Sequence, residues 1–232
     1  MIYRTFNEIE KAVLSSGNKK TIALCGAHDS HSLDAVLNAK RMGLCNAVLI
    51  GNEDMIKDLL KERNEDPDEY EIFASEEADC SKIAVKLIHE GKADIPMKGM
   101  MQTSDFMRPI LNKETGLIEA GNALSQVTLV EYPKEERFFM ITDCAINIAP
   151  DLQRKKQIIE NAVSLAKKLG IEKAKVAALS ALEIVNQKMP STVDADELQK
   201  MSKRNEFKDC LVYGPLAFDN AISKEAAEHK RI

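Results

Sequence analysis

Residues 96–108 read PMKGMMQTSDFMR, a glycine-containing loop that follows a short apolar segment and opens a helix-like one. A helix that begins after such a loop presents free backbone N–H groups to an anion. Lys98 and Arg108 add positive charge, and an arginine can hold a phosphate through two parallel hydrogen bonds. Pro109 fits best in a first helical turn, so we expect the helix to begin late, near residues 104–105, or to be kinked. The stretch predicts a site for phosphate or a phosphorylated small molecule; the alternative is a solvated, charged turn.

The chain before this loop alternates between strand-like and helix-like segments. Expected strands are 21–25, 47–50, 70–73 and 94–97, and expected helices are 33–44, 52–63 with Asn52 as N-cap, and one that Ser75 caps. Four strands separated by helical crossovers imply a parallel sheet that helices cover on both faces. The fold class is therefore predicted to be α/β.

The pattern changes after Leu117, where two strand-like segments flank a polar turn, as in an antiparallel hairpin. The further expected elements are the hairpin strands 127–132 and 138–141, a helix 152–169 that Gly170 ends, strands 176–179 and 210–213, and helices from 180–185, over 194–201 and over 217–229. We therefore predict two domains: a first α/β domain of residues 1–122 and a second α/β domain with a hairpin, residues 123–232.

The composition is that of a globular protein. Among 232 residues, 44% are hydrophobic and 30% are charged, and no apolar run is long enough to span a bilayer. The N-terminus lacks the apolar stretch of a signal peptide, so a cytoplasmic location is expected. A net charge of −5 argues against nucleic acid as the main partner. The cysteines are far apart without a CxxC pair, so neither disulfides nor a metal site is expected.

Three other polar clusters follow predicted strands, where open α/β sheets bind ligands. They are Asp143 and Asn147 in the segment 142–147, Ser180 with Glu183, and Asp219 with Asn220 after Gly214-Pro215. Each has a structural alternative, because Asp and Asn hold turns through local hydrogen bonds and Ser-x-x-Glu is the spacing of a helix capping box. From the residues alone both readings stay open.

The segment 26–31, GAHDSH, follows the first predicted strand but lacks the G-x-G-x-x-G dinucleotide fingerprint. His28 and His31 are expected to lie in a turn rather than to bind a metal, because no matching carboxylate or cysteine cluster accompanies them.

Several motifs in order resemble the phosphate acyltransferase family, which contains phosphate acetyltransferases and butyryltransferases. The matching segments are MKG at 97–99 with Thr103 and Arg108, LS at 124–125, TDCAIN at 142–147, KVAALSALE at 175–183, MPSTVDA at 189–195 and GPLAFDNA at 214–221. The MPST and GPLA segments are more similar to the butyryl than to the acetyl branch.

The resemblance implies a two-domain, three-layer α/β/α fold similar to isocitrate and isopropylmalate dehydrogenases, with the active site between the domains. It implies reversible transfer of a short or branched acyl group between coenzyme A and inorganic phosphate, with coenzyme A as substrate and no bound cofactor, in a homo-oligomer that needs no membrane. The substrate-binding residues that we infer are Lys98, Gly99, Thr103, Arg108, Ser125, Asp143, Asn147, Ser180, Asp219 and Asn220.

Family members continue beyond the position of Ile232, and that continuation carries groups thought to act on coenzyme A. We therefore expect a C-terminally incomplete first domain and assign no catalytic base. Two alternatives stay open: a non-catalytic remnant that binds coenzyme A or phosphate, and a metal- and NADP-dependent dehydrogenase of similar fold.

Overall fold

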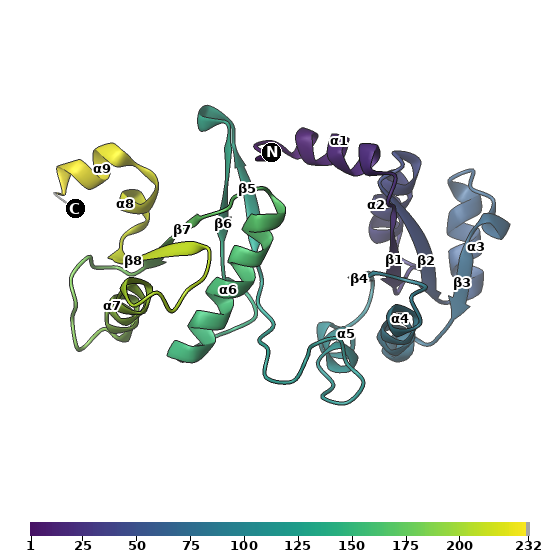
Figure 1. Ribbon diagram of the computed structural model, residues 1–232. Coiled ribbons are helices and arrows are strands. Elements are labelled where there is room, and N and C mark those ends of the chain that lie inside the picture. Colours follow the sequence, from purple (N-terminus) through teal and green to yellow (C-terminus); the bar gives the residue numbers. More distant parts are fainter. Residues whose placement is uncertain (231–232) are drawn as a thin grey trace. The chain divides into compact units, whose positions relative to one another are not determined.

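The computed structural model describes residues 1–230 and divides into two compact units. One unit is Asn7–Asn122, and the other combines Met1–Phe6 with the chain from Ala123 onward. The last two residues of the predicted second domain, Arg231 and Ile232, lie outside the described residues. Figure 1 shows the elements of both units, and each unit is described by itself below.

The unit Asn7–Asn122 contains the predicted parallel sheet, with strand order β3-β2-β1-β4. Its strands are β1 (Lys20–Cys25), β2 (Cys45–Gly51), β3 (Glu71–Ala74) and β4 (Ile95–Lys98). Its helices are α2 (Ser30–Arg41), α3 (Glu53–Glu62), α4 (Cys80–His89) and α5 (Thr103–Ile110), with short 3-10 turns at Pro67–Glu69 and Glu77–Asp79. The helix α1 (Phe6–Ser16), which the sequence analysis did not predict, has no buried residue.

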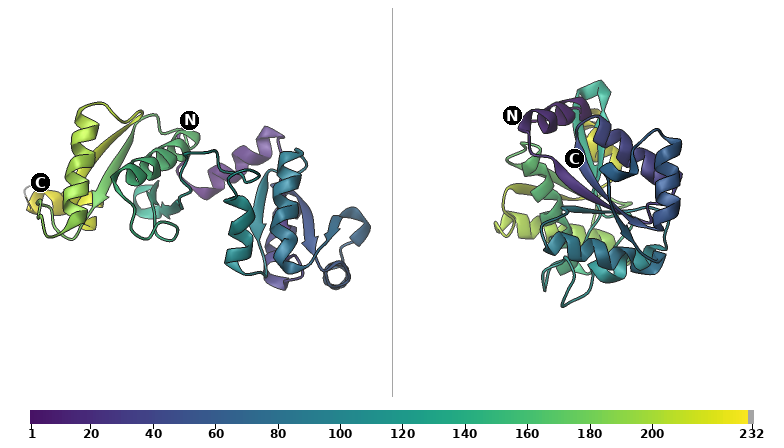
Figure 2. Two further views of the ribbon diagram at one scale, coloured as in Figure 1. Left: turned by 90° about the horizontal axis from the view of Figure 1, so that it is seen from below. Right: turned by 90° about the vertical axis from the view of Figure 1, so that its right-hand side faces the viewer.

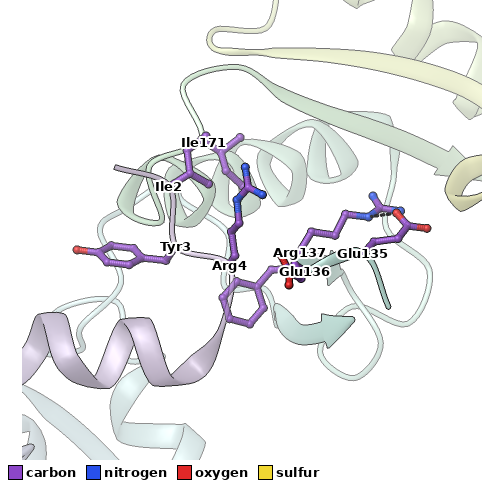
Figure 3. A pocket seen from close by; sticks show the side chains of 8 residues that line it. Ile2, Tyr3, Arg4, Glu135, Glu136, Arg137 and Ile171 are labelled. Carbon is purple, nitrogen blue, oxygen red and sulfur yellow. Dashed lines mark ion pairs between the residues drawn. The ribbon is translucent and has the colours of Figure 1, made fainter. Parts of the chain in front are cut away.

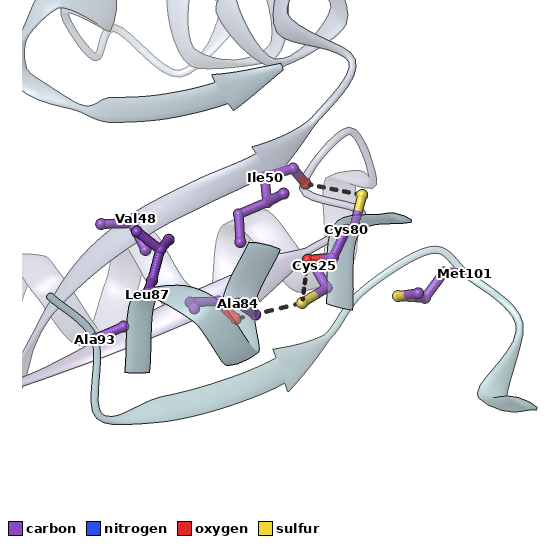
Figure 4. Packing of buried hydrophobic residues seen from close by; sticks show 9 residues of the cluster. Cys25, Val48, Ile50, Cys80, Ala84, Leu87, Ala93 and Met101 are labelled. Carbon is purple, nitrogen blue, oxygen red and sulfur yellow. Dashed lines mark hydrogen bonds between the residues drawn. The ribbon is translucent and has the colours of Figure 1, made fainter. Parts of the chain in front are cut away.

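Both faces of this sheet are covered, because side chains along a strand alternate between its two faces. Leu24 and Leu49 pack on one face against buried side chains of α2 and α3. Cys25 and Ile50, their neighbours in sequence, pack on the other face against α4 (Figure 4). The two helical layers appear on opposite sides of the strands in Figure 2. The prediction of an α/β fold with a parallel sheet is confirmed.

The other unit contains the predicted hairpin and a pair of parallel strands. The hairpin strands β5 (Thr128–Tyr132) and β6 (Arg137–Ile141) are antiparallel and joined by a 3-10 turn, Pro133–Glu135. The parallel pair is β7 (Ala174–Leu179) and β8 (Cys210–Leu216), and the helices are α6 (Leu152–Lys168), α7 (Pro190–Lys203), α8 (Phe218–Ile222) and α9 (Lys224–His229). Side chains of α6, α7, β7 and β8 form one buried cluster, with Ala166, Val212 and Leu198 among its most buried members.

Three local predictions are wrong. No helix begins at 180–185; this segment is irregular, and Ser180 Oγ bonds Ser191 Oγ at 2.8 Å instead of capping. Ser75 caps no helix either, because its hydroxyl donates to the carbonyl oxygen of Glu76 at 2.9 Å. The segment predicted as one helix over 217–229 is divided at Ser223, whose side chain caps α9.

No helix among residues 1–230 combines the length and the apolar character that a membrane-crossing segment needs.

Candidate substrate site

The loop after β4 lies against the loop after β1, at the carboxyl edge of the parallel sheet. Gly99 N donates to the carbonyl oxygen of Cys25 at 2.7 Å, and Met100 N donates to that of Gly26 at 3.2 Å. A Cβ on Gly99 would lie 2.6 Å from the carbonyl oxygen of Gly26, and Gly26 itself has φ +71°. Glycine is required at both positions because the two backbones approach more closely than a side chain allows.

The side chain of Lys98 closes over its own loop. Its Nζ donates to the carbonyl oxygens of Met101 at 3.0 Å and Gly99 at 3.4 Å. An ammonium group has three donors, so one N–H of Lys98 remains for a ligand. Lys98, which was predicted to bind phosphate, therefore also holds the loop in its conformation.

The helix α5 begins at Thr103, earlier than predicted. Its N-cap residue, Gln102, makes no side-chain hydrogen bond to the first turn, so that turn is open to an anion. Pro109 is the residue before the last one of α5. At this position the missing N–H costs the helix only one of its final hydrogen bonds.

Arg108 lies in the last turn of α5 with its side chain 74% exposed, and its Nη2 is 3.1 Å from Asp105 Oδ1. Because helical side chains incline toward the N-terminus, this ion pair directs the guanidinium back along α5 toward Thr103. Because the guanidinium side of this pair is open to water, Arg108 can exchange Asp105 for a phosphate. Lys98, Gly99, Thr103 and Arg108 therefore come from one continuous loop and helix.

In the other unit, Ser125, Asp143 and Asn147 lie in one hydrogen-bonded group. Asn147 Nδ2 donates to Asp143 Oδ2 at 2.6 Å and to the carbonyl oxygen of Leu124 at 2.9 Å. The N–H of Gln126 donates to Asp143 Oδ2 at 3.3 Å. The loop after β6 is thus joined to the residues on either side of Ser125.

Asp143 acts mainly as the anchor of its own loop. Its Oδ1 accepts from the N–H groups of Ala145 and Ile146, both at 2.9 Å. Burial raises the pKa of Asp143, but these two backbone bonds, with those from Asn147 and Gln126, outweigh burial and hold the pKa at about 2. The carboxylate is therefore ionised at neutral pH and acts as an acceptor only.

Asn220 and Asp219 are linked through hydrogen bonds and an ion pair to Glu183, the residue at capping-box spacing from Ser180, and to Lys230. Asn220 Nδ2 donates to Glu183 Oε1 at 2.8 Å, and Lys230 Nζ donates to the same oxygen at 2.7 Å. The bond from Lys230, followed by that from Asn220, lowers the pKa of Glu183. Lys230 also lies 3.1 Å from Asp219. Asn220 is buried, and its Oδ1 has no partner among residues 1–230.

The comparisons with known proteins agree on one family. The model described as phosphate acetyl/butaryl transferase matches residues 56–232. A phosphate butyryltransferase of Clostridium acetobutylicum is 42% identical over 230 residues, which are 99% of this chain and 76% of that protein. The chain belongs to the phosphate acetyl/butyryl transferase family.

Both branches of this family are represented among its relatives. A phosphate acetyltransferase of Thermotoga maritima is 36% identical over 97% of this chain and 76% of that protein. The crystal structure of a branched-chain phosphotransacylase from Enterococcus faecalis has a TM-score of 0.76 and 34% identity, covering 91% of this chain and 74% of that one. A phosphotransacetylase from Streptococcus pyogenes, with a TM-score of 0.78, 22% identity and coverage of 97% and 77%, shares the fold.

Neither of two cavities in the described chain is lined by a predicted site residue. One, of about 290 Å³, lies between the N-terminal segment and the hairpin and is lined by Ile2, Tyr3, Arg4, Glu135, Glu136, Arg137, Phe138 and Ile171 (Figure 3). Its Arg137 is paired with Glu135 at 2.6 Å. The other, of about 370 Å³, is lined by α4 side chains with Pro109 and Thr115.

The residues that hold the predicted ones in place were not predicted from the sequence. The N–H of Gln126 donates to Asp143, and Asn161 donates to Ser125. Glu183 accepts from Asn220 and from Lys230. Glu183 was noted only as half of a capping box. For Asn161 no local signal existed, because its partner Ser125 is 36 residues away in the sequence.

Proposed function

We propose that this chain transfers a short or branched acyl group reversibly between coenzyme A and inorganic phosphate. The observation that carries the proposal is membership of the family, with 42% identity to a phosphate butyryltransferase over 99% of the chain. The 34% identical branched-chain phosphotransacylase supports an acyl group of this size. As a phosphate acyltransferase, the protein is an enzyme of the transferase class.

The phosphate subsite proposed here is the loop and helix 98–108. This segment carries three kinds of donor: the remaining N–H of Lys98, the open first turn of α5, and the exposed guanidinium of Arg108. Each favours a doubly charged oxyanion, by charge or by the helix dipole. Thr103, the first residue of α5, adds a hydroxyl at the same end of the helix.

The polar residues of the other unit are proposed to bind the rest of the substrates. Ser125 offers a hydroxyl on a segment that Asp143 and Asn147 hold rigid. Ser180, Asp219 and Asn220 offer hydroxyl, carboxylate and amide groups for the polar atoms of coenzyme A. A fixed donor is more effective than a mobile one because its orientation is set before the substrate arrives.

The chemistry requires that the thiol of coenzyme A lose its proton to a base. The thiolate then attacks the carbonyl carbon of the acyl phosphate, and the carbonyl oxygen becomes an oxyanion. When the carbon–oxygen bond to phosphate breaks, thioester and inorganic phosphate form, so no acyl–enzyme bond is needed. Lys98 and Arg108 act by attracting and orienting the phosphate, which also neutralises the charge on the leaving group.

The proposal includes two domains, residues 1–122 and 123–232. It also includes a fold related to isocitrate and isopropylmalate dehydrogenases, a homo-oligomeric assembly and a cytoplasmic location. The separation of the chain into two compact units near residue 122 supports the two domains.

The direct test is to incubate the purified protein with butyryl-CoA and phosphate and to measure free thiol. Acetyl-CoA and isobutyryl-CoA provide the comparison of chain length, and omission of phosphate is the control. We expect phosphate-dependent thiol release. Thermal stabilisation by coenzyme A without thiol release would instead show a binding protein of the same family. Absence of both would refute the proposal.

A further inference from the structure

Ser125 lies on a segment in which every residue from 123 to 126 takes part in a hydrogen bond to a side chain. Asn161, on α6, bonds the carbonyl oxygen of Ala123 and Ser125 Oγ, both at 2.9 Å. Asn147 bonds the carbonyl oxygen of Leu124, and Thr142 Oγ1 donates to that of Gln126 at 2.6 Å. So dense a set of bonds on four consecutive residues outside a helix or strand fixes both the position and the direction of Ser125.

The orientation of the Asn161 amide follows from its two partners. The carbonyl oxygen of Ala123 can only accept a hydrogen bond, so the amide must present its nitrogen there. The same nitrogen donates its second hydrogen to Ser125 Oγ. Ser125 Oγ is therefore an acceptor in this contact, and its own hydrogen points elsewhere. Within residues 1–230 no acceptor for that hydrogen is recorded.

We propose that Asn161 is a positioning residue, which directs the Ser125 hydroxyl hydrogen toward an oxygen of the acyl phosphate. The inference rests on the proposed function and names a residue that acts through Ser125 rather than on the substrate. A free serine hydroxyl rotates among three positions, whereas a hydroxyl that already accepts a fixed bond has fewer left. The hydrogen is then aligned before the substrate binds and stabilises negative charge that develops on the oxygen.

Ser125 keeps its proton throughout this step. Asn161 is neutral and donates through both of its amide hydrogens, so it cannot act as a base toward the hydroxyl. Ser125 is thus a hydrogen-bond donor to the substrate and forms no covalent bond with it.

The variant Asn161→Asp tests the direction of this hydrogen bond. The aspartate has the same shape but only acceptors, so the Ser125 hydroxyl would turn its hydrogen toward residue 161 and away from the substrate. We expect kcat/KM for acyl phosphate to fall at least tenfold. Asn161→Ala removes the bond without reversing it and is expected to cause a smaller loss. Melting temperatures of both variants show how much of the effect belongs to folding.

The double variant with Ser125→Ala separates positioning from other effects. If Asn161 acts through the hydroxyl, then Asn161→Asp has little further effect on kcat/KM once Ser125 is alanine. A loss of the same size in both backgrounds would overturn the inference and leave the proposed function intact, because it would arise from the new charge or from the bond to Ala123. A wild-type protein without any turnover would overturn both.

Discussion

At the scale of single residues, the two cations of the loop 98–108 differ in how firmly they are held. Lys98 Nζ has two carbonyl partners within its own loop. Arg108 has an exposed ion pair with Asp105 and no role in the core. Removing Lys98 would therefore change both loop and charge, while removing Arg108 changes charge almost alone. Arg108 is the better probe of the phosphate subsite.

For Arg108→Ala we expect a KM for phosphate about tenfold higher, the effect of losing roughly 1.4 kcal/mol from a charge-assisted hydrogen bond. The melting temperature should change little, because exposed ion pairs contribute at most about 1 kcal/mol. Steady-state kinetics with varied phosphate measures the effect. Lys113→Ala, at an exposed cation just beyond α5, is the matched control and should leave KM unchanged. If both variants had the same KM for phosphate, Arg108 would have no specific role in phosphate binding.

Residue-scale reasoning from sequence could find the ends of the strands but not the contacts across the fold. Lys98 and Gly99 were predicted because loop, glycine and charge are adjacent in the chain. For Asp143 and Asn147 the sequence allowed either a ligand site or a turn held by local hydrogen bonds. The bonds from the N–H groups of Ala145 and Ile146 to Asp143 are local bonds that hold such a turn. Asn161 and Lys230 were beyond reach, since their partners lie 36 and 47 residues away.

At the scale of elements, the helix caps separate local from tertiary determinants. Asn52 was predicted to cap a helix, and its Oδ1 accepts from the N–H of Met55 at 3.0 Å at the start of α3. Ser75 was predicted to do the same, but the chain forms a 3-10 turn, Glu77–Asp79, before α4 begins. Ser180 has capping-box spacing, yet Glu183 bonds Asn220 and Lys230 instead. A cap motif can therefore fail through a local bond, as at Ser75, or through distant partners, as at Glu183.

The variants Asn52→Ala and Ser75→Ala test whether only Asn52 stabilises a helix as its cap. Loss of the Asn52 cap should lower the free energy of unfolding by about 1 kcal/mol, because one N–H of the first turn of α3 loses its acceptor. Ser75→Ala should change it by less than about 0.5 kcal/mol, since no helix depends on that hydroxyl. Urea unfolding followed by circular dichroism compares both with the wild type. A larger loss at Ser75 than at Asn52 would contradict this account of the caps.

At the scale of the whole molecule, the described chain has separate hydrophobic cores. Leu49 belongs to the core under α2 and α3 in the unit Asn7–Asn122. Leu198 belongs to the core between α6, α7 and the β7–β8 pair in the other unit. Both side chains are almost fully buried, at 0% and 3% exposure. If the two units on either side of residue 122 unfold independently, each core should stabilise only its own unit.

The matched variants Leu49→Ala and Leu198→Ala test this boundary by hydrogen exchange. Each removes similar buried volume and should cost roughly 2–5 kcal/mol within its own unit. We expect Leu49→Ala to speed exchange in β1, β2 and α2 while β7 and β8 keep their protection, and Leu198→Ala to do the reverse, because local opening follows the contacts that are lost. Mass spectrometry of peptides from both units measures each effect, with the unaltered unit of the same sample as internal control. Faster exchange throughout the chain in either variant would mean that residues on both sides of 122 unfold as one cooperative body.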